Sequence, residues 1–166
     1  MNLVLIGFPR AGKTTLAVKL ASKLEVPFID SDDLCMAYHN SMTCSEIFTL
    51  FGEPYFRKLE TKAIKELEKC DGAVIATGGG TLLNPQNLNS LKNRSLFIYL
   101  DTEKAVLKKR LLSPPLPAYI SAEDPESSFE KLYQNRLPIY QQIADIKWSC
   151  SSLPLCFFSN NLVPCS

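Results

Sequence analysis

The chain has 166 residues, of which 46% are hydrophobic and 21% charged, and its formal net charge at pH 7 is +1. This length and composition are typical of one globular domain and exclude an intrinsically disordered chain. The basic residues are scattered, so neither nucleic acid nor an anionic membrane is expected as a partner. No apolar run reaches membrane-spanning length, no export signal is recognised, and the six cysteines show no metal-like spacing. We therefore expect a cytoplasmic protein with reduced thiols.

Short apolar runs alternate with segments of helical periodicity along the chain. The apolar runs predict buried strands at residues 2–6, 26–30, 72–77, 94–100 and 145–150. Apolar residues at helical spacing predict helices at residues 14–25, 53–70, 102–112 and 129–145. Because this alternation is typical of parallel β-α-β units, we expect a single three-layer α/β domain over residues 1–166.

Three local features refine this pattern near the end of the chain. Asp101 or Thr102 is expected to cap the helix at 102–112. Residues 113–128 are rich in proline and acidic residues and predict a loop, with a mobile flap at about 112–126. Pro138 falls inside the last helical segment and predicts a break near Arg136–Leu137, because proline lacks the N–H that a helix interior needs.

The stretch GFPRAGKTT at residues 7–15 follows the first predicted strand and opens the first predicted helix. It matches G-x-x-x-x-G-K-[ST], a loop whose backbone N–H groups surround nucleotide phosphates, and this strand–loop–helix setting disfavours an accidental match. Lys13 is expected to reach the outer phosphates and the Thr14 hydroxyl to bind Mg²⁺. No N-K-x-D motif of GTP-binding switches follows, and mechanical ATPases usually have larger domains. A small-molecule kinase is the predicted class.

Two further stretches fall at the expected carboxyl ends of strands, where parallel sheets bind ligands. Asp30 and Asp32 would share one side of an extended segment, one serving Mg²⁺ and the other accepting a hydrogen bond from an acceptor hydroxyl. A helix N-cap is the alternative, and one residue can do both. The glycines at 78–80 predict a backbone that approaches a ligand closely, with a flexible surface turn as the alternative.

Five motifs follow one another along the chain: GxxxxGKTT, FIDSD, FRxxE (Phe56, Arg57, Glu60), ATGGG and NRxPxY (Asn135, Arg136, Pro138, Tyr140). In this order they resemble the shikimate kinase family, and the resemblance extends from residue 2 to about 148. The phosphate loop is common to many enzymes, whereas the ordered set of the other four motifs is specific.

The resemblance implies both a fold and a reaction. The fold is the P-loop kinase fold, with a five-stranded parallel sheet of order 2-3-1-4-5 flanked by helices, and a flap. The reaction is ATP-dependent transfer of the γ-phosphate to the 3-hydroxyl of shikimate, in the chorismate pathway of aromatic amino acid biosynthesis. Small kinases of this shape are often monomers, so a monomer is expected.

By motif position, the resemblance also assigns residues to each ligand. Asp32 would hold the shikimate hydroxyls and act as a base, with Lys13 as the second catalytic residue. Thr14 and Asp30 would serve Mg²⁺, and Glu60 would brace Arg57. Shikimate would contact Asp32, Arg57, Gly79, Gly80 and Arg136, and the two arginines would hold its carboxylate. ATP would contact Arg10, Ala11, Gly12, Lys13, Thr14, Thr15 and Arg110.

Each predicted arginine contact has a simpler alternative. For Arg57 and Arg136 the alternative is a surface ion pair, and acidic neighbours make it credible for Arg57. For Arg110, expected on the adenine ring, the alternative is a solvated helix face.

The chain departs from the family pattern in the phosphate loop, the flap and the tail. Arg10 replaces a small residue, commonly glycine, and could anchor phosphate or point to solvent. Pro114 stands where the family usually has an arginine that reaches the transferring phosphate. Residues 151–166 carry two prolines and no charge, which predicts that the family's closing helix is absent. The cations that could compensate in the flap region are Lys108, Lys109 and Arg110.

These departures leave two alternatives beside shikimate kinase. One is a related small-molecule kinase, such as one acting on gluconate, which would need another use for Arg57 and Arg136. The other is a catalytically impaired protein that binds nucleotide or shikimate without turnover, as the loss of the flap arginine suggests.

Overall fold

The computed structural model describes residues 1–149 and contains a five-stranded parallel sheet of order β2-β3-β1-β4-β5. Val4 at the centre of the sheet lies opposite Ile75 on one side and Phe97 on the other. The predicted strand order is confirmed, and β2 and β3 are shorter than expected. The strands are β1 (Asn2–Ile6), β2 (Phe28–Asp30), β3 (Val74–Ala76), β4 (Ser95–Asp101) and β5 (Ile146–Ser149).

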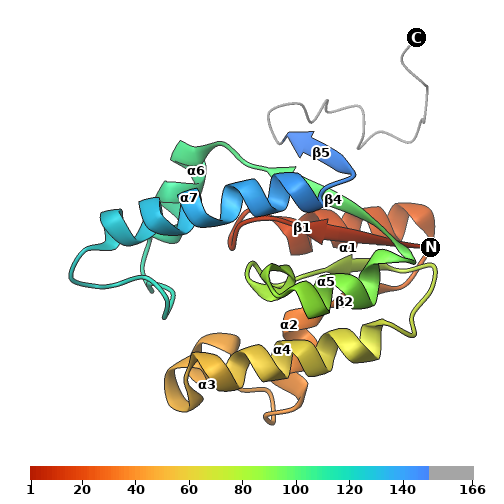
Figure 1. The fold of residues 1–166 in the computed structure, drawn as a ribbon, viewed down its shortest axis with the longest axis horizontal. Helices are drawn as coiled ribbons and strands as arrows, with labels where there is room; N and C mark the ends of the chain where they lie inside the picture. The colour runs from red at the N-terminus through yellow and green to blue at the C-terminus, as the bar shows by residue number, and fades with distance from the viewer. Residues whose placement is uncertain (150–166) are drawn as a thin grey trace.

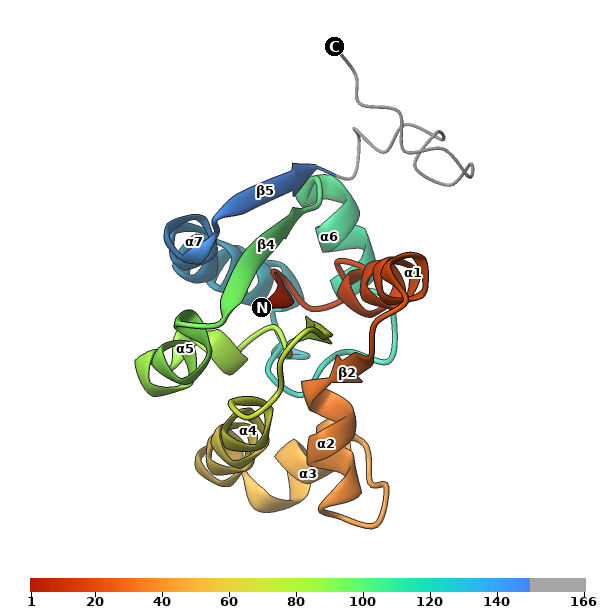
Figure 2. The same ribbon diagram turned by 90° about the vertical axis from the view of Figure 1, so that its right-hand side faces the viewer.

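Helices cover both faces of this sheet, which gives the expected three layers (Figure 1). On one face lie α1 (Lys13–Leu24) and α6 (Lys104–Leu111); on the other lie α4 (Glu53–Leu67), α5 (Pro85–Lys92) and α7 (Pro125–Ile143) (Figure 2). Successive side chains of a strand point to opposite faces of the sheet, so each strand contributes to a hydrophobic core on either face. Under α1 the buried core contains Leu5, Ala17, Ala21, Val74 and Ala76. The larger core on the other face includes Val4, Ile6, Ile64, Ile75, Leu91 and Phe129.

A small group of helices extends the domain beyond β2. It consists of α2 (Ser31–Ala37), α3 (Cys44–Phe51) and the first half of α4, which lie together below the sheet in Figure 2. This group matters for the site because α2 starts directly at the carboxyl end of β2 and α4 carries Arg57. Its own buried cluster is formed by Cys35, Ile47, Phe56, Leu59 and Ala63.

No residue ranges were predicted for the helices α2, α3 and α5, although each carries a start signal. Asp30 caps α2, as in the N-cap alternative given by the sequence. Thr43 and Glu46 form a capping box at the start of α3, with each side chain bonded to the other's backbone N–H. Asn84 caps α5, and Pro85 occupies its first turn. These short helices have too few turns for apolar periodicity to stand out, so the caps were the usable signal.

Two sequence predictions about helix ends are wrong. Neither Asp101 nor Thr102 caps α6, which starts behind Glu103 with no side-chain cap; the Thr102 hydroxyl donates to the carbonyl of Ala11 instead. No break occurs at Arg136–Leu137, because α7 continues through Pro138. Phe129 and Tyr140 are buried on either side of the proline, and this packing offsets one missing backbone hydrogen bond.

The helix α7 also starts earlier than expected. Asp124 caps it by accepting a hydrogen bond from the Ser127 N–H, so the loop between α6 and α7 ends at Asp124. None of the helices within residues 1–149 is long and apolar enough to cross a membrane. Two predictions fall outside the described residues: the absence of a closing helix at 151–166 and the end of the last strand at Cys150. A single domain over residues 1–166 therefore stays a prediction.

Candidate active site

The phosphate loop connects β1 to α1 and borders a cavity of about 710 Å³, here called the nucleotide cavity. Gly7 and Gly12 have φ of 139° and 103°, values that favour glycine, and a Cβ at Gly7 would lie 3.1 Å from the Leu100 carbonyl oxygen. The loop thus follows a path that other residues would strain. All residues predicted to bind ATP line this cavity: Arg10, Ala11, Gly12, Lys13, Thr14, Thr15 and Arg110.

Lys13 is a buried cation in this loop. Its ammonium donates to the carbonyls of Gly7 at 3.1 Å and Phe8 at 2.7 Å. Burial lowers the pKa of Lys13 to about 8, although the nearby carboxylates of Asp32 and Asp30 act to raise it. An ammonium whose hydrogen-bond acceptors are neutral carbonyls retains strong attraction for an anion such as a triphosphate.

Thr14 and Asp30 meet beside Lys13. The Thr14 hydroxyl donates to Asp30 Oδ2 at 2.8 Å, while Asp30 Oδ1 accepts from the Asp32 N–H at 2.9 Å and caps α2. Asp30 is therefore a helix cap and a member of the predicted metal pair at once. Within residues 1–149, no group of three or more His, Cys, Asp or Glu side chains could hold a metal ion. A hydroxyl and one carboxylate suit Mg²⁺, which keeps water and phosphate oxygens as its other ligands.

Asp32 does not continue an extended segment, as the sequence predicted, but lies in the first turn of α2. The helical turn still keeps its carboxylate near Asp30. Burial, followed by the charge of Asp30, raises the pKa of Asp32 to about 7, and the positive charge of Lys13 acts against this rise. A carboxyl group with a pKa near neutrality can accept or release a proton under physiological conditions.

A second cavity of about 280 Å³, here called the acceptor cavity, adjoins the first. Both cavities are lined by Pro9, Arg10, Asp32 and Gly79. The remaining walls come from α3, α4, the glycine loop, the flap and α7. All residues predicted to contact the acceptor line this cavity: Asp32, Arg57, Gly79, Gly80 and Arg136.

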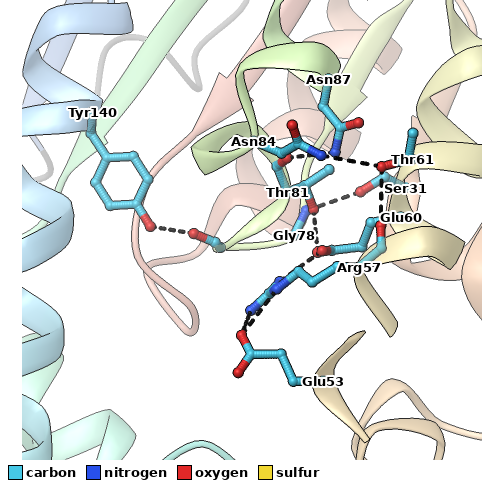
Figure 3. Close-up of polar contacts among 11 residues, drawn as sticks. Ser31, Glu53, Arg57, Glu60, Thr61, Gly78, Thr81, Asn84, Asn87 and Tyr140 are labelled. Carbon is cyan, nitrogen blue, oxygen red and sulfur yellow. Dashed lines mark hydrogen bonds and ion pairs between the residues drawn. The ribbon is translucent and has the colours of Figure 1, made fainter. Parts of the chain in front are cut away.

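Arg57 is held between two carboxylates of its own helix (Figure 3). It donates to Glu60 at 2.7 Å and, through Nε and Nη2, to Glu53 at 3.2 and 3.0 Å. Glu60 is 2% exposed and also accepts from the Thr81 hydroxyl at 2.7 Å. The predicted contact between Glu60 and Arg57 is therefore present. The pair is more than a surface ion pair, because its Glu60 side is buried and hydrogen-bonded to a second element.

The three glycines pack against the side chains of the site. A Cβ would lie 2.6 Å from Asp32 Oδ1 at Gly78, 2.5 Å from the Pro9 ring at Gly79, and 2.6 Å from Arg57 Nη1 at Gly80. The Gly78 N–H donates to Ser31 Oγ at 2.9 Å (Figure 3). The loop is thus fixed, against the alternative of a flexible surface turn. Its lack of side chains serves the close approach of Asp32, Pro9 and Arg57.

Arg136 faces the acceptor cavity from α7 and has no carboxylate partner among residues 1–149. Its guanidinium carbon lies 5.4 Å from the centre of the Tyr119 ring. Among residues 1–149, no Asp or Glu is within ion-pair distance of it. The alternative of a surface ion pair therefore does not hold for Arg136, whose charge is available to an anionic ligand.

Arg10 points toward the flap and not toward Lys13. Its guanidinium donates to the backbone carbonyls of Arg110, Ser113 and Pro115. Of the three cations considered as substitutes for a flap arginine, Lys108 is paired with Glu126. Of these three cations, Arg110 is the one that lines the nucleotide cavity.

The family model for shikimate kinase matches residues 9–154. The chain belongs to the shikimate kinase family. It is 35% identical over 162 residues to a shikimate kinase of Legionella pneumophila (strain Corby), and the match covers 98% of this chain and 92% of that protein.

Solved structures place this family member among P-loop kinases. Shikimate kinase from Acinetobacter baumannii in complex with shikimate has a TM-score of 0.82 and 30% identity, covering 98% of this chain and 95% of its own. A gluconokinase from Sinorhizobium meliloti 1021 has a TM-score of 0.53 and 15% identity, with coverages of 94% and 85%. At that identity the second likeness shows a shared fold alone.

Sequence reasoning missed two aromatic residues of the site in this family member. The Tyr140 hydroxyl donates to the Gly79 carbonyl and so ties α7 to the glycine loop. Tyr140 belongs to the NRxPxY motif, and its place in that motif was the available signal. Tyr119 lines the acceptor cavity beside Arg136 but lies in a proline-rich stretch without a motif, so the sequence offered no signal for it.

Proposed function

We propose that this chain transfers the γ-phosphate of ATP to the 3-hydroxyl of shikimate, in the chorismate pathway. One observation carries the proposal: the nucleotide cavity and the acceptor cavity meet at Asp32. A phosphate loop on one side and two arginines on the other suit transfer from a triphosphate to a carboxylated alcohol. The likeness to the Acinetobacter baumannii enzyme, whose structure contains shikimate, supports the choice of acceptor.

On the nucleotide side, Lys13 and the backbone N–H groups of the loop would bind the phosphates of ATP. Thr14 and Asp30 would hold Mg²⁺, which neutralises phosphate charge when bound. Arg110 lines the same cavity at the end of α6, where it could contact the adenine ring. Lys13 then serves catalysis by electrostatic stabilisation of the phosphoryl group that moves.

Asp32 would hold the acceptor hydroxyl at the junction of the two cavities. Its carboxylate would accept the hydrogen bond from the hydroxyl and take the proton as the new P–O bond forms, while the bond from the γ-phosphorus to the bridging oxygen breaks and ADP leaves with that oxygen. The raised pKa of about 7 makes this transfer easier than it would be for an ordinary aspartate. Phosphoryl transfer depends mainly on positioning and charge neutralisation, so orienting the hydroxyl is the larger part of this role.

Arg57 and Arg136 would bind the carboxylate of shikimate. A guanidinium presents parallel N–H donors that match both oxygens of a planar carboxylate. Arg57 is braced by Glu60 and Glu53, whereas Arg136 has no anionic partner within residues 1–149. The glycines at 79 and 80 let the acceptor approach the loop backbone.

The test is ADP release with ATP, Mg²⁺ and shikimate, run beside gluconate and a control without acceptor. Shikimate-dependent release supports the proposal, and gluconate-dependent release would favour the related kinase. Pro114 in place of a flap arginine keeps a second candidate open, a protein that binds shikimate without turnover. Calorimetric binding of shikimate with no ADP release would identify it. We also expect a cytoplasmic monomer without a nucleic-acid or membrane partner, and light scattering tests the monomer.

A further inference from the structure

Arg10 fastens the phosphate loop to the start of the flap. Its Nη1 donates to the Arg110 carbonyl at 2.7 Å and the Ser113 carbonyl at 2.8 Å, and its Nη2 donates to the Pro115 carbonyl at 2.7 Å. In return, Arg110 Nη1 donates to the carbonyls of Arg10 and Ala11 at 3.2 and 3.3 Å. Five hydrogen bonds thus join the loop to the end of α6 and to residues 113–115.

The flap segment that Arg10 holds continues directly into the wall of the acceptor cavity. Residues 115–119 line that cavity, and Tyr119, the last residue of this segment, lies against Arg136. The wall is anchored again at Ile120, which is 5% exposed and whose N–H donates to the Pro117 carbonyl at 2.9 Å. The position of Pro115 therefore affects where Tyr119 meets Arg136.

The flap has no cation of its own to make such an anchor. Residues 112–124 contain neither Lys nor Arg, so the charge that holds this segment comes from the phosphate loop. Arg10 is suited to the task because its fork of N–H donors can serve several carbonyls in different directions. A lysine would supply a charge at this position but not the same geometry.

We propose that Arg10 is a positioning residue that fixes the flap against the phosphate loop and thereby shapes the shikimate side of the site. This role differs from the phosphate contact expected from the sequence. The hydrogen bonds of Arg10 lead away from Lys13 and toward the flap, while Lys13 and the loop N–H groups remain for the phosphates.

Steady-state kinetics separate the two roles of Arg10. For Arg10→Ala we expect the KM for shikimate to rise about tenfold, equivalent to about 1.4 kcal/mol, with the KM for ATP within about twofold of wild type. Arg10→Lys should behave like Arg10→Ala, because a lysine cannot reproduce the fork. The control is Arg94→Ala, an exposed arginine just before β4, at the opposite end of the sheet. A raised KM for ATP that lysine restores, with an unchanged KM for shikimate, would overturn the proposal.

Because this kinetic test rests on the proposed function, a second measurement is independent of turnover. Hydrogen exchange of the protein without ligands should be faster in residues 112–120 of Arg10→Ala and Arg10→Lys, and unchanged in α4 and in Arg94→Ala. Unchanged exchange in residues 112–120 would refute the anchoring role. Absence of shikimate-dependent ADP release in the wild type would instead refute the proposed function, and the exchange result would still decide the role of Arg10.

Discussion

The nucleotide cavity and the acceptor cavity share Asp32 but take their walls from different kinds of chain segment. About half of the residues that line the nucleotide cavity form one continuous stretch, residues 9–16, and the others come from α1, β2, α2, the segment 77–79 after β3, β4 and α6. The acceptor cavity takes residues from α3, α4, the glycine loop, the flap and α7. A local motif therefore determines one side of the site, and tertiary packing assembles the other.

This difference appears in how each cation is held. Lys13 is bonded to carbonyls of its own loop, so its position follows from the loop conformation. Arg57 depends on Glu60, which is in turn bonded to Thr81 beyond β3. Changes in the acceptor cavity should therefore affect one substrate selectively, whereas a change at the shared Asp32 should affect the whole reaction.

The largest effect is expected for Asp32→Asn. We expect kcat to fall by about 10²–10⁴-fold, because the amide cannot accept the proton of the hydroxyl. In the wild type, kcat/KM should decrease below about pH 7, since protonated Asp32 can no longer accept. Steady-state ADP release against pH measures both. The matched control is Asp33→Asn, an exposed carboxylate on the same helix. Activity of Asp32→Asn within tenfold of wild type would show that Asp32 is not at the reacting hydroxyl.

Arg136→Ala tests whether shikimate binding can be weakened while ATP binding stays unchanged. We expect the KM for shikimate to rise about 10–100-fold, as for loss of a charge-assisted hydrogen bond, with little change in the KM for ATP. Arg136→Lys should recover only part of the loss, because the fork is missing. Lys131→Ala, an exposed cation on the same helix, serves as the control. Equal effects of Arg136→Ala on both KM values would show that the carboxylate role is wrong.

The contrast between the cavities also explains what the sequence could predict. The strand order came from a family resemblance and is confirmed, and the five strands came from local apolar runs and are present, with β2 and β3 shorter than predicted. Lys13 and Thr14 lie beside the nucleotide cavity because a local motif fixes the loop, and their contacts with phosphate and Mg²⁺ stay predictions. The partners of Arg10 were not predictable, since they are backbone carbonyls about 100 residues away in the sequence. Every residue carries a backbone carbonyl, so no residue type marks such a partner. Pro138 misled the prediction because the burial of Phe129 and Tyr140 is tertiary information.

Gly80→Ala should weaken shikimate binding less than Arg136→Ala does. The new Cβ would lie 2.6 Å from Arg57 Nη1, the far end of a flexible side chain, so the guanidinium must move while the fold persists. We expect the KM for shikimate to rise about three- to tenfold and the free energy of unfolding to change by less than about 1 kcal/mol. Gly72→Ala is the opposite control. Its Cβ meets no atom within 4 Å but its φ is +69°, so it should lose stability without a change in KM.

The smallest effect concerns the free energy of unfolding and tests whether the ionised Asp32 destabilises the folded protein. The pKa of Asp32 in the folded protein, about 7, lies above the ordinary aspartate value of 3.8, so the folded protein binds an extra proton between about pH 4 and pH 7. Stability from this group is therefore present at low pH and lost as the pH rises through that window. Asp32→Asn removes the ionised form, so we expect it to increase the free energy of unfolding by about 1–2 kcal/mol at about pH 8, and to make little difference at about pH 4. Urea unfolding at both pH values measures this. A loss of stability at the higher pH would mean that attraction to Lys13 outweighs burial and the repulsion from Asp30, and that the shared carboxylate supports the fold as well as the reaction.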